Sequence, residues 1–383
     1  MERGLNTKCV HVEVEESDCR HYGAISFPIY QTATYAHPGV GQSTGFDYSR
    51  VQNPTRKRLE QYIAQLEGGI DAFALSSGMA AISLLFEIFE PGDHIIAEED
   101  LYGGSVRLFD NILKKNNYEV TYLRSSEDDI ENQIKDNTKA IYIETPTNPM
   151  MNITDITKIA ELAKKYQIFL IVDNTFLSPY FQNPLKLGAD VVIHSGTKFL
   201  GGHNDTLAGF IVTNNKEIQE KLRFLIKTTG PVLAPFDSWL LMRGIKTLGL
   251  RMERAEKNAF EIVQWLKEQE HISKVFYPGL PEHPGYEIMK KQARGFGSML
   301  TFCVDKKENA LKILESTKLI KFAESLGGVE TLITYPKTQT HSDVPEEKRL
   351  KNGITDKTLR LSVGIEDIED IINELENVFG LLD

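Results

Sequence analysis

The stretch Asp190–Asp205, DVVIHSGTKFLGGHND, is the starting point for reading the fold of this chain. It begins as an apolar strand, Val191 to Ile193, and continues with small polar residues, one lysine and two glycines. Lysine is rarely buried without a partner. Lys198 is therefore either an ordinary loop residue or a group that is held in place for chemistry, and this stretch alone leaves both interpretations open.

Short apolar runs recur on both sides of this stretch, and helical stretches separate several of them. The runs DAFALSSG, DHIIAEE, EVTYLR, KAIYIETP and FLIVDNTF have the length of strands, and TDITKIAELAKKYQ has a helical period. Alternating strands and helices predict an α/β fold with a mostly parallel sheet that is covered on both faces. Such sheets bind their ligands at the carboxyl ends of the strands.

Three regions divide the chain. Residues 1–50 are rich in Gly, Pro, Thr and Tyr and lack a helical period, so we expect an extended arm that reaches a neighbouring subunit. Residues 51–245 carry the α/β pattern and predict a large ligand-binding domain. A long helical stretch over residues 236–269 leads into residues 246–383, whose runs GSMLTFCV, LITYP and TLRLSVGIED predict a smaller C-terminal α/β domain.

Composition and charge exclude several classes of protein. The 383 residues are 41% hydrophobic and 25% charged, and the net charge is -11, which is typical of globular proteins and argues against non-specific nucleic-acid binding. No apolar run approaches the roughly 18 residues of a membrane span, and the N-terminus MERGLNTKCVHVEVEESDCR lacks the apolar core of a secretory signal. Cys9, Cys19 and Cys303 are too few and scattered for a disulfide framework or a metal site. We expect a cytoplasmic protein without a metal.

Chemical groups gather at the predicted strand ends. Asp173 follows the strand FLIV and Lys198 follows DVVIH, so an acid and a lysine should lie near each other at the mouth of the sheet. Ser77, Gly78 and Met79 open a helix directly after a strand, and the unpaired N–H groups of a helix N-terminus suit an anion. Each feature alone has a plain alternative, either an ion pair or a capped helix.

Together, these groups match what pyridoxal 5'-phosphate (PLP) needs. A lysine forms a Schiff base with PLP, and a carboxylate keeps its ring nitrogen protonated so that the ring serves as an electron sink. Helix N–H groups and the hydroxyls of Ser195 and Thr197 would hold its phosphate. An aromatic residue should lie against the ring, and Tyr102 follows the strand DHIIAEE. Its neighbours Gly103 and Gly104 would allow a planar ligand to approach closely.

The chain resembles the Cys/Met-metabolism family of PLP enzymes, which contains cystathionine γ-lyase, cystathionine γ-synthase, cystathionine β-lyase and methionine γ-lyase. The resemblance covers nearly the whole chain and implies the aspartate-aminotransferase-like fold (fold type I). It rests on YSRVQNPTR, SSGMAA, DLYGG, ETPTNP, VDNTF, HSGTKFLGGH, APFDSWLLMRGIKTLGLRM, YPGLPEHPG, ESLGGVETL and LRLSVGIED. One departure is small: the family usually reads GHSD after the lysine, and this chain has Asn204 in place of the serine.

The resemblance implies a role for each site residue. Lys198 is the Schiff-base lysine, Asp173 pairs with the ring nitrogen, and Tyr102 stacks on the ring and takes part in proton transfer. The phosphate ligands that it implies are Gly78, Met79, Ser195 and Thr197, joined by Tyr48 and Arg50 from the arm of the neighbouring subunit. The substrate-binding residues that it implies are Arg360, for the α-carboxylate, with Asn148 and Ser325 nearby, and Asp47 and Glu324. Shared sites imply an obligate dimer, paired into a homotetramer.

The residues separate the members of this family only in part. Loss of a sulfur group from Cβ gives a β-lyase, loss from Cγ gives a γ-lyase, and addition of a thiol in its place gives a γ-synthase. Methionine γ-lyases have a cysteine after YG, where this chain has Gly104. The acids Asp47 and Glu324 suit the distal ammonium of cystathionine, although solvated surface charges would look the same. We expect cystathionine γ-lyase chemistry. The alternatives are a γ-synthase or O-acetylhomoserine thiolyase, a β-lyase, an aminotransferase and a non-catalytic PLP-binding relative.

Overall fold

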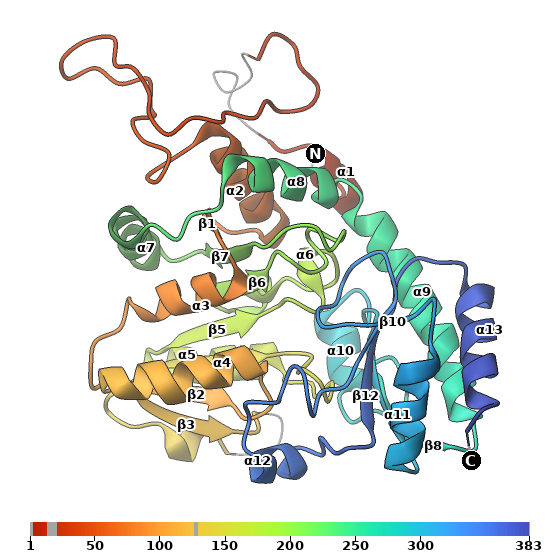
Figure 1. Ribbon diagram of the computed structural model, residues 1–383. Helices are drawn as coiled ribbons and strands as arrows, with labels where there is room; N and C mark the ends of the chain where they lie inside the picture. The colour runs from red at the N-terminus through yellow and green to blue at the C-terminus, as the bar shows by residue number, and fades with distance from the viewer. Residues whose placement is uncertain (1–2, 14–20, 126–128, 383) are drawn as a thin grey trace.

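A seven-stranded sheet forms the centre of the computed structural model, which describes residues 3–13, 21–125 and 129–382 (Figure 1). The strand order is β1-β7-β6-β5-β4-β2-β3, and all strands are parallel except β7, which is antiparallel to both of its neighbours. The mostly parallel sheet predicted from the sequence is confirmed. Its strands are β1 (Asp71–Leu75), β2 (His94–Glu98), β3 (Glu119–Leu123), β4 (Thr138–Glu144), β5 (Phe169–Asp173), β6 (Val191–Ser195) and β7 (Gly209–Thr213).

Helices cover both faces of this sheet because successive side chains of each strand point to opposite faces. In β7, Phe210 and Val212 belong to the apolar core under one set of helices, and Ile211 belongs to the core under the other set. The first set is α2 (Pro54–Glu67), α8 (Pro235–Ile245) and the start of α9 (Leu248–Lys267). The second set is α3 (Gly78–Phe86), α4 (Gly103–Leu108) and α7 (Lys216–Thr229). Helix α5 (Ile156–Tyr166) packs on β4 and β5.

A second, five-stranded sheet forms the C-terminal part, in the order β10-β11-β12-β9-β8. Its strands are β8 (Ile272–Phe276), β9 (Met299–Val304), β10 (Lys321–Phe322), β11 (Leu332–Thr334) and β12 (Thr358–Ser362). Helices α11 (Lys307–Ser316) and α13 (Ile368–Phe379) pack against it together with the second half of α9, around an apolar core of their own. The domain boundary predicted at residue 245 falls between α8 and α9, and it stays a prediction.

The long helical stretch predicted over residues 236–269 is two helices in the structure. Thr247 lies between them with φ -110 and ψ 10, outside helical geometry. The break frees the carbonyl of Gly244, which accepts hydrogen bonds from Thr247 N at 3.1 Å and from Arg251 Nη2 at 2.9 Å. Because Arg251, at the start of α9, donates to a carbonyl at the end of α8, the break between the helices leaves this carbonyl hydrogen-bonded.

The N-terminal part is less irregular than the sequence predicted. It contains a short helix, α1 (Leu5–Val10), whose buried Cys9 belongs to the core shared with α2 and α9. Six residues are too few to show a helical period in a sequence. Residues 21–50 form no helix or strand beyond one bridge between Thr34 and Tyr48, and they extend away from the body of the molecule in Figure 1. Their predicted contact with a neighbouring subunit stays a prediction.

The remaining helical elements are short. They are α6 (Ser178–Phe181), α10 (Tyr286–Gln292) and α12 (Glu346–Lys351), with single turns at Phe109–Leu113, Lys114–Asn116, Glu131–Gln133 and Pro184–Leu187. Cys9 and Cys303 are free thiols, and Cys19 lies outside the described residues. Within the described ranges, no helix has both the length and the apolar character needed to cross a membrane.

Candidate active site

The sheet brings the predicted site residues together at the carboxyl ends of its strands. β4, β5 and β6 are parallel neighbours, so Glu144, Asp173 and the turn after Ser195 meet at one edge. Strand β1 ends at the same edge and leads through Ser77 into α3. A cavity of about 370 Å³ opens there.

Eleven of the fourteen predicted site residues line this cavity, and the other three lie on the N-terminal segment outside it. The eleven are Gly78, Met79, Tyr102, Asn148, Asp173, Ser195, Thr197, Lys198, Glu324, Ser325 and Arg360. Outside it, Asp47 accepts a hydrogen bond from Ser43 Oγ at 2.7 Å. The Arg50 guanidinium lies 5.4 Å from the centre of the Tyr48 ring and donates to the carbonyl of Lys227. A single chain thus assembles only part of the predicted site.

The Lys198 amine lies in this cavity without a carboxylate partner. Its Nζ donates to Ser325 Oγ at 2.8 Å, and no carboxylate of the described residues lies within 4.0 Å of it. Burial, helped by the charge of Arg360 and opposed by that of Glu324, lowers the pKa of Lys198 to about 8. An amine with this pKa is partly neutral near physiological pH, so it can act as a nucleophile or a base.

The turn that carries Lys198 has a glycine where a side chain would not fit. Gly202 has a φ of +72°, and a Cβ at this position would lie 2.0 Å from Arg251 Nη1. The same guanidinium nitrogen donates to the carbonyl of Phe199 at 2.7 Å, which fixes the peptide beside Lys198. Asn204, the departure from the family motif, has a φ of 53°, a conformation that asparagine tolerates, and it lies outside the cavity lining.

Asp173 is oriented by hydrogen bonds from its neighbours. Its Oδ1 accepts from Thr175 N at 3.0 Å and from Thr175 Oγ1 at 2.5 Å, and the Tyr142 hydroxyl donates to Oδ2 at 3.4 Å. Thr175 Oγ1 accepts in turn from Ser195 N at 2.9 Å, which ties β5 to β6. Burial raises the pKa of Asp173, and the Thr175 hydrogen bonds oppose that rise. The carboxylate is therefore held in one orientation at the cavity wall.

Glu144 is a second buried carboxyl group in this cavity, and the sequence analysis did not assign it to the site. It pairs in register with Asp173, and its Oε2 accepts from Tyr102 N at 3.1 Å. Burial raises the pKa of Glu144 well above its usual range, and the charge of Asp173 raises it further. Because Asp173 has more donors, the charge belongs on Asp173 and the proton on Glu144. An acid at the end of an apolar strand, KAIYIE, is the signal that identifies it.

The N-terminus of α3 forms a cradle for an anion. Ser77 Oγ accepts from Ala80 N at 3.0 Å and so caps the helix, while the amides of Gly78 and Met79, in its first turn, have no intrahelical acceptor. A Cβ at Gly78 would lie 3.0 Å from the Cβ of Ser195, so a side chain there would crowd the cradle. These amides suit a phosphate group.

Arg360 is buried, with 1% of its surface exposed, and no carboxylate of the described residues lies within 4.0 Å of it. Its Nη1 donates to Asn148 Oδ1 at 2.8 Å, and its Nη2 donates to the Ser325 carbonyl at 2.9 Å and to Thr334 Oγ1 at 3.1 Å. Its Nε, also buried, has no acceptor among the described residues. Burial lowers the pKa of Arg360 to about 10. A cation in this position fits an incoming carboxylate.

Tyr102 lies at the start of α4, and its ring folds back over Gly104. A Cβ at Gly104 would lie 2.4 Å from Tyr102 Cε1, and a Cβ at Gly103 would lie 2.2 Å from the carbonyl oxygen of Thr340. The sequence predicted that a planar ligand could approach both glycines; in the structure the Thr340 carbonyl occupies the space beside Gly103, whereas Gly104 lines the cavity. The Tyr102 side chain itself lines the cavity and is 38% exposed.

The segment 336–343, which follows β11, adds a wall that the sequence analysis missed. Gln339, Thr340, Ser342 and Asp343 line the cavity from this segment, and Arg107 lines it from α4. The segment is a series of turns without a periodic pattern, so no signal in a single sequence marks it.

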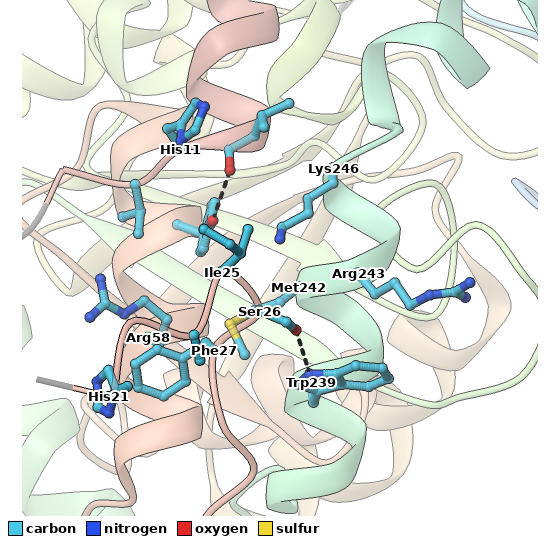
Figure 2. Close-up of a pocket in the computed structure, with 14 residues that line it drawn as sticks. His11, His21, Ile25, Ser26, Phe27, Arg58, Trp239, Met242, Arg243 and Lys246 are labelled. Carbon is cyan, nitrogen blue, oxygen red and sulfur yellow. Dashed lines mark hydrogen bonds between the residues drawn. The ribbon is translucent and has the colours of Figure 1, made fainter. Parts of the chain in front are cut away.

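Another cavity, of about 480 Å³, lies between the N-terminal segment, α2 and α8 (Figure 2). In Figure 2 the Trp239 indole donates to Ser26 Oγ across this cavity, at 3.3 Å. None of the fourteen predicted site residues lines it. In the described parts of the chain, no group of three or more His, Cys, Asp or Glu residues could hold a metal ion. The candidate chemistry therefore lies in the cavity around Lys198.

The fold and the groups in this cavity fit a PLP-dependent enzyme. An amine, a carboxylate, an anion cradle and an aromatic ring meet at the carboxyl edge of a mostly parallel sheet, as such a cofactor requires. The family model described as "Cys/Met metabolism PLP-dependent enzyme" matches residues 6–380, and the chain belongs to this family.

Similar proteins carry several related names. The chain is 50% identical over 361 residues to the cystathionine gamma-lyase of Bacillus subtilis (strain 168), covering 93% of this chain and 95% of that one. It is 48% identical over 375 residues to the cystathionine beta-lyase of Lactococcus lactis subsp. cremoris (strain MG1363), covering 97% and 98%. The crystal structure of cystathionine gamma-lyase from Lactobacillus plantarum complexed with L-serine matches with a TM-score of 0.95 and 43% identity, over 99% of both chains. Other relatives are named cystathionine gamma-synthase.

Proposed function

We propose that this enzyme cleaves the Cγ–S bond of L-cystathionine and, with one water molecule, releases cysteine, 2-oxobutanoate and ammonia. One observation carries the proposal: a desolvated lysine amine and a buried guanidinium share one cavity, and neither has a carboxylate partner among the described residues. Arg360, with Asn148 beside it, takes the α-carboxylate of the amino-acid substrate. This contact directs the Cα–H bond toward the part of the cavity that holds Lys198.

Different residues of the chain would bind the cofactor and transfer protons in this reaction. PLP, when bound, supplies the electron sink for negative charge at Cα. Lys198 would hold it covalently, Asp173 would keep its ring nitrogen protonated, and the first turn of α3, with Ser195 and Thr197, would hold its phosphate. Once released, the Lys198 amine removes the proton from Cα and can return it. A further proton leaves Cβ before the sulfur departs from Cγ; the Lys198 amine would accept it, and the Tyr102 hydroxyl, which lines the same cavity, would take part in these transfers.

The active site is shared between two copies of the chain in this proposal, and the dimers pair into a homotetramer. Tyr48 and Arg50 lie outside the cavity of their own chain, on a segment that extends away from the body. A wide groove of about 990 Å³ shares Thr197, Glu324 and Ser325 with the cavity. The arm of a second copy would reach the phosphate end of the cavity through this groove.

Cleavage at Cγ is favoured over its alternatives by the position of Glu324. This acid lines the cavity, where it can meet the distal ammonium of cystathionine. The relatives do not separate the alternatives, because γ-lyases, β-lyases and γ-synthases are similarly close to this chain. A γ-synthase or O-acetylhomoserine thiolyase would use the same residues with a thiol entering at Cγ, and a β-lyase would break the bond at Cβ.

The deciding experiment gives L-cystathionine to the PLP-loaded enzyme and identifies the keto acid by mass spectrometry. Formation of 2-oxobutanoate with cysteine supports γ-cleavage. Formation of pyruvate with homocysteine makes the enzyme a β-lyase and contradicts the argument from Glu324 for cleavage at Cγ. In a second incubation O-acetylhomoserine and cysteine replace cystathionine, and net synthesis of cystathionine without either keto acid would move the assignment to a γ-synthase. Conversion of the cofactor to its pyridoxamine form would indicate an aminotransferase.

A further inference from the structure

We propose that His341 is a positioning residue that ties the peptide before Tyr102 to the backbone of Asn148, so that both residues keep a fixed place at the cavity. The inference deepens the proposed function and rests on it, since Tyr102 and Asn148 take their roles from it. It assigns a task to a buried histidine that the motifs of the sequence did not mark.

The His341 side chain reaches two loops with one nitrogen. Its Nε2 lies 3.1 Å from the carbonyl oxygen of Asn148 and 3.3 Å from that of Leu101. Because a carbonyl can only accept, Nε2 carries the ring proton and donates to both oxygens. Nδ1 then accepts from the hydroxyl of Thr340, 2.8 Å away. Both ring nitrogens are thus hydrogen-bonded, and these bonds select one tautomer of the imidazole.

The imidazole of His341 is also neutral. The residue is 2% exposed. Burial, helped by the charge of Arg360, lowers the pKa of His341 to about 4, although the two carbonyl hydrogen bonds oppose this shift. His341 therefore contributes a hydrogen-bond donor at pH 7 and adds no second positive charge near the Arg360 guanidinium.

The two loops that His341 joins are each bonded to a group of the candidate site. The peptide before Tyr102 accepts from His341 through its carbonyl and donates through the Tyr102 N–H to Glu144 Oε2, at 3.1 Å. Asn148 accepts from His341 through its backbone carbonyl and from Arg360 Nη1 through its side chain, at 2.8 Å. His341 therefore links the tyrosine assigned to the cofactor ring with the asparagine assigned to the α-carboxylate.

The backbone of His341 is anchored by bonds that do not involve the imidazole. Its N–H donates to the Pro336 carbonyl at 3.0 Å. Its carbonyl accepts from Val344 N at 3.1 Å and from Arg349 Nη1 at 3.2 Å. Because these bonds remain when the side chain is changed, a substitution of His341 should loosen the two loops and leave the turn segment 336–343 in place.

The test measures how well the enzyme distinguishes a carboxylate from a neutral group of the same shape. L-Alanine and L-alaninamide differ only at the α-carboxylate, and neither has a C–S bond that γ- or β-cleavage could break. Their dissociation constants for the PLP-loaded enzyme are obtained from the cofactor absorbance at one pH. The ratio of the two constants reports recognition of the α-carboxylate, and comparing this ratio between variants cancels the difference between the two amines.

Three substitutions of His341 separate the donor from the bulk of the side chain. His341→Leu removes the donor, His341→Gln keeps an amide N–H at the distance of Nε2, and the shorter amide of His341→Asn reaches only the distance of Nδ1. The matched control is His94→Leu. His94 is also buried, its two ring nitrogens lie 2.8 Å and 2.9 Å from the hydroxyls of Thr138 and Thr121, and it lies at the start of β2, outside the cavity.

His341→Leu and His341→Asn should each lower the preference for alanine over alaninamide about tenfold, because Asn148 no longer holds the Arg360 guanidinium in a fixed place. His341→Gln should restore this preference to within about twofold of the wild type. His94→Leu should lower the melting temperature and leave the preference unchanged. If His341→Leu does not fold, the comparison of His341→Gln with His341→Asn decides the same question.

Two results would overturn the proposal. One is a preference that stays at the wild-type value in His341→Asn and in folded His341→Leu. The other is a fall in His341→Gln as large as that in His341→Asn, since the donor would then not be what matters. A double-mutant cycle adds a further check: in an Asn148→Ala background, His341→Leu should have no additional effect on the preference. An undiminished additional effect would contradict action through Asn148.

Release of the cofactor tests the contact with the peptide before Tyr102. PLP should leave the loaded His341→Leu enzyme faster than the wild type, because this peptide loses its bond to the imidazole. The same substitution should not speed release further in a Tyr102→Ala background. Release is followed by absorbance after dilution. A wild-type release rate in His341→Leu would contradict action through Tyr102.

The binding measurements separate this proposal from the proposed function. A lowered preference in His341→Asn that His341→Gln restores, found in an enzyme that does not cleave cystathionine, would support the role of His341 and count against the proposed function alone. Cleavage of cystathionine at Cγ together with an unchanged preference in His341→Asn would do the reverse.

Discussion

The two parts of the proposed site differ in how the chain holds them. Asp173, at the end of β5, is buried, and Lys198, three residues after β6, is half-buried; both are hydrogen-bonded within one chain. Tyr48 and Arg50 lie on a segment joined to itself by a single bridge, and the Tyr48 side chain is 45% exposed. The sheet therefore positions Asp173 and Lys198 at the cavity of their own chain, whereas Tyr48 and Arg50 lie outside that cavity. In the proposed function, one chain supplies the groups of the first part, and a second copy supplies Tyr48 and Arg50 for the phosphate.

Among these predictions, removal of the Lys198 amine should have the largest effect on activity. Lys198→Ala should lower turnover of the PLP-loaded enzyme by at least about a thousandfold, because the nucleophile and the base are lost together. The absorbance of the lysine-bound cofactor should disappear, and the melting temperature should stay near that of the wild type. Lys186→Ala, at an exposed lysine outside the cavity, is the control. Retained turnover in Lys198→Ala would remove Lys198 from the mechanism.

Arg360→Lys tests whether substrate binding depends on the planar shape of the guanidinium as well as on its charge. An ammonium cannot reproduce the planar contacts with Asn148, Ser325 and Thr334 and still meet a carboxylate with two donors. We expect kcat/KM to fall by about a hundredfold, mainly through KM, since substrate binding is what is lost. Steady-state kinetics check this. A fall in kcat at an unchanged KM would contradict the role in binding.

Mixing two inactive proteins tests whether the arm part acts in a second copy. Tyr48→Phe/Arg50→Ala lacks a working arm and Lys198→Ala lacks the lysine, so a mixed dimer has one intact site only if the arm serves its partner. After unfolding and refolding together, statistical pairing in a symmetric dimer should restore about a quarter of wild-type activity. Each protein refolded alone is the control. An inactive mixture would mean that each chain builds its own site.

The smallest expected effect is on the pH dependence of cofactor uptake. Only a neutral amine can attack the aldehyde of PLP, and the pKa of Lys198 is lowered to about 8. The fraction of neutral amine, and with it the rate of PLP binding by the cofactor-free protein, should rise about threefold between pH 7.5 and 8.5 and then level off. Stopped-flow absorbance measures this rate. A rise that continues to pH 10 would indicate an ordinary exposed lysine.

The sequence predicted those parts of the site that follow buried strands. Asp173 and Glu144 directly follow apolar runs, and Lys198 lies five residues after the run that ends at Ile193. Only Asp173 and Lys198 were predicted to belong to the site. Helix α1 was missed because six residues do not establish a period. The break between α8 and α9 was missed because Thr247 lies within an otherwise helical pattern.

Other features of the site were beyond sequence reasoning because they depend on tertiary contacts. Arg107 and Asp343 are 236 residues apart, and only the packing of the turn segment 336–343 on α4 brings them together. The role of Gly103 was predicted wrongly for a related reason: the sequence shows that space is needed beside it, but not that the Thr340 carbonyl fills that space.

Arg251 joins two places that a protein engineer would treat as separate. Its guanidinium binds the carbonyl of Phe199, beside Lys198, and the carbonyl of Gly244, where α8 gives way to α9. A chimaera that takes its C-terminal sheet from a relative would place its junction at this break. Such a chimaera has to keep Arg251 and Gly202, which lies against it. Otherwise a change made at the junction between the two sequences would also alter the turn that carries Lys198.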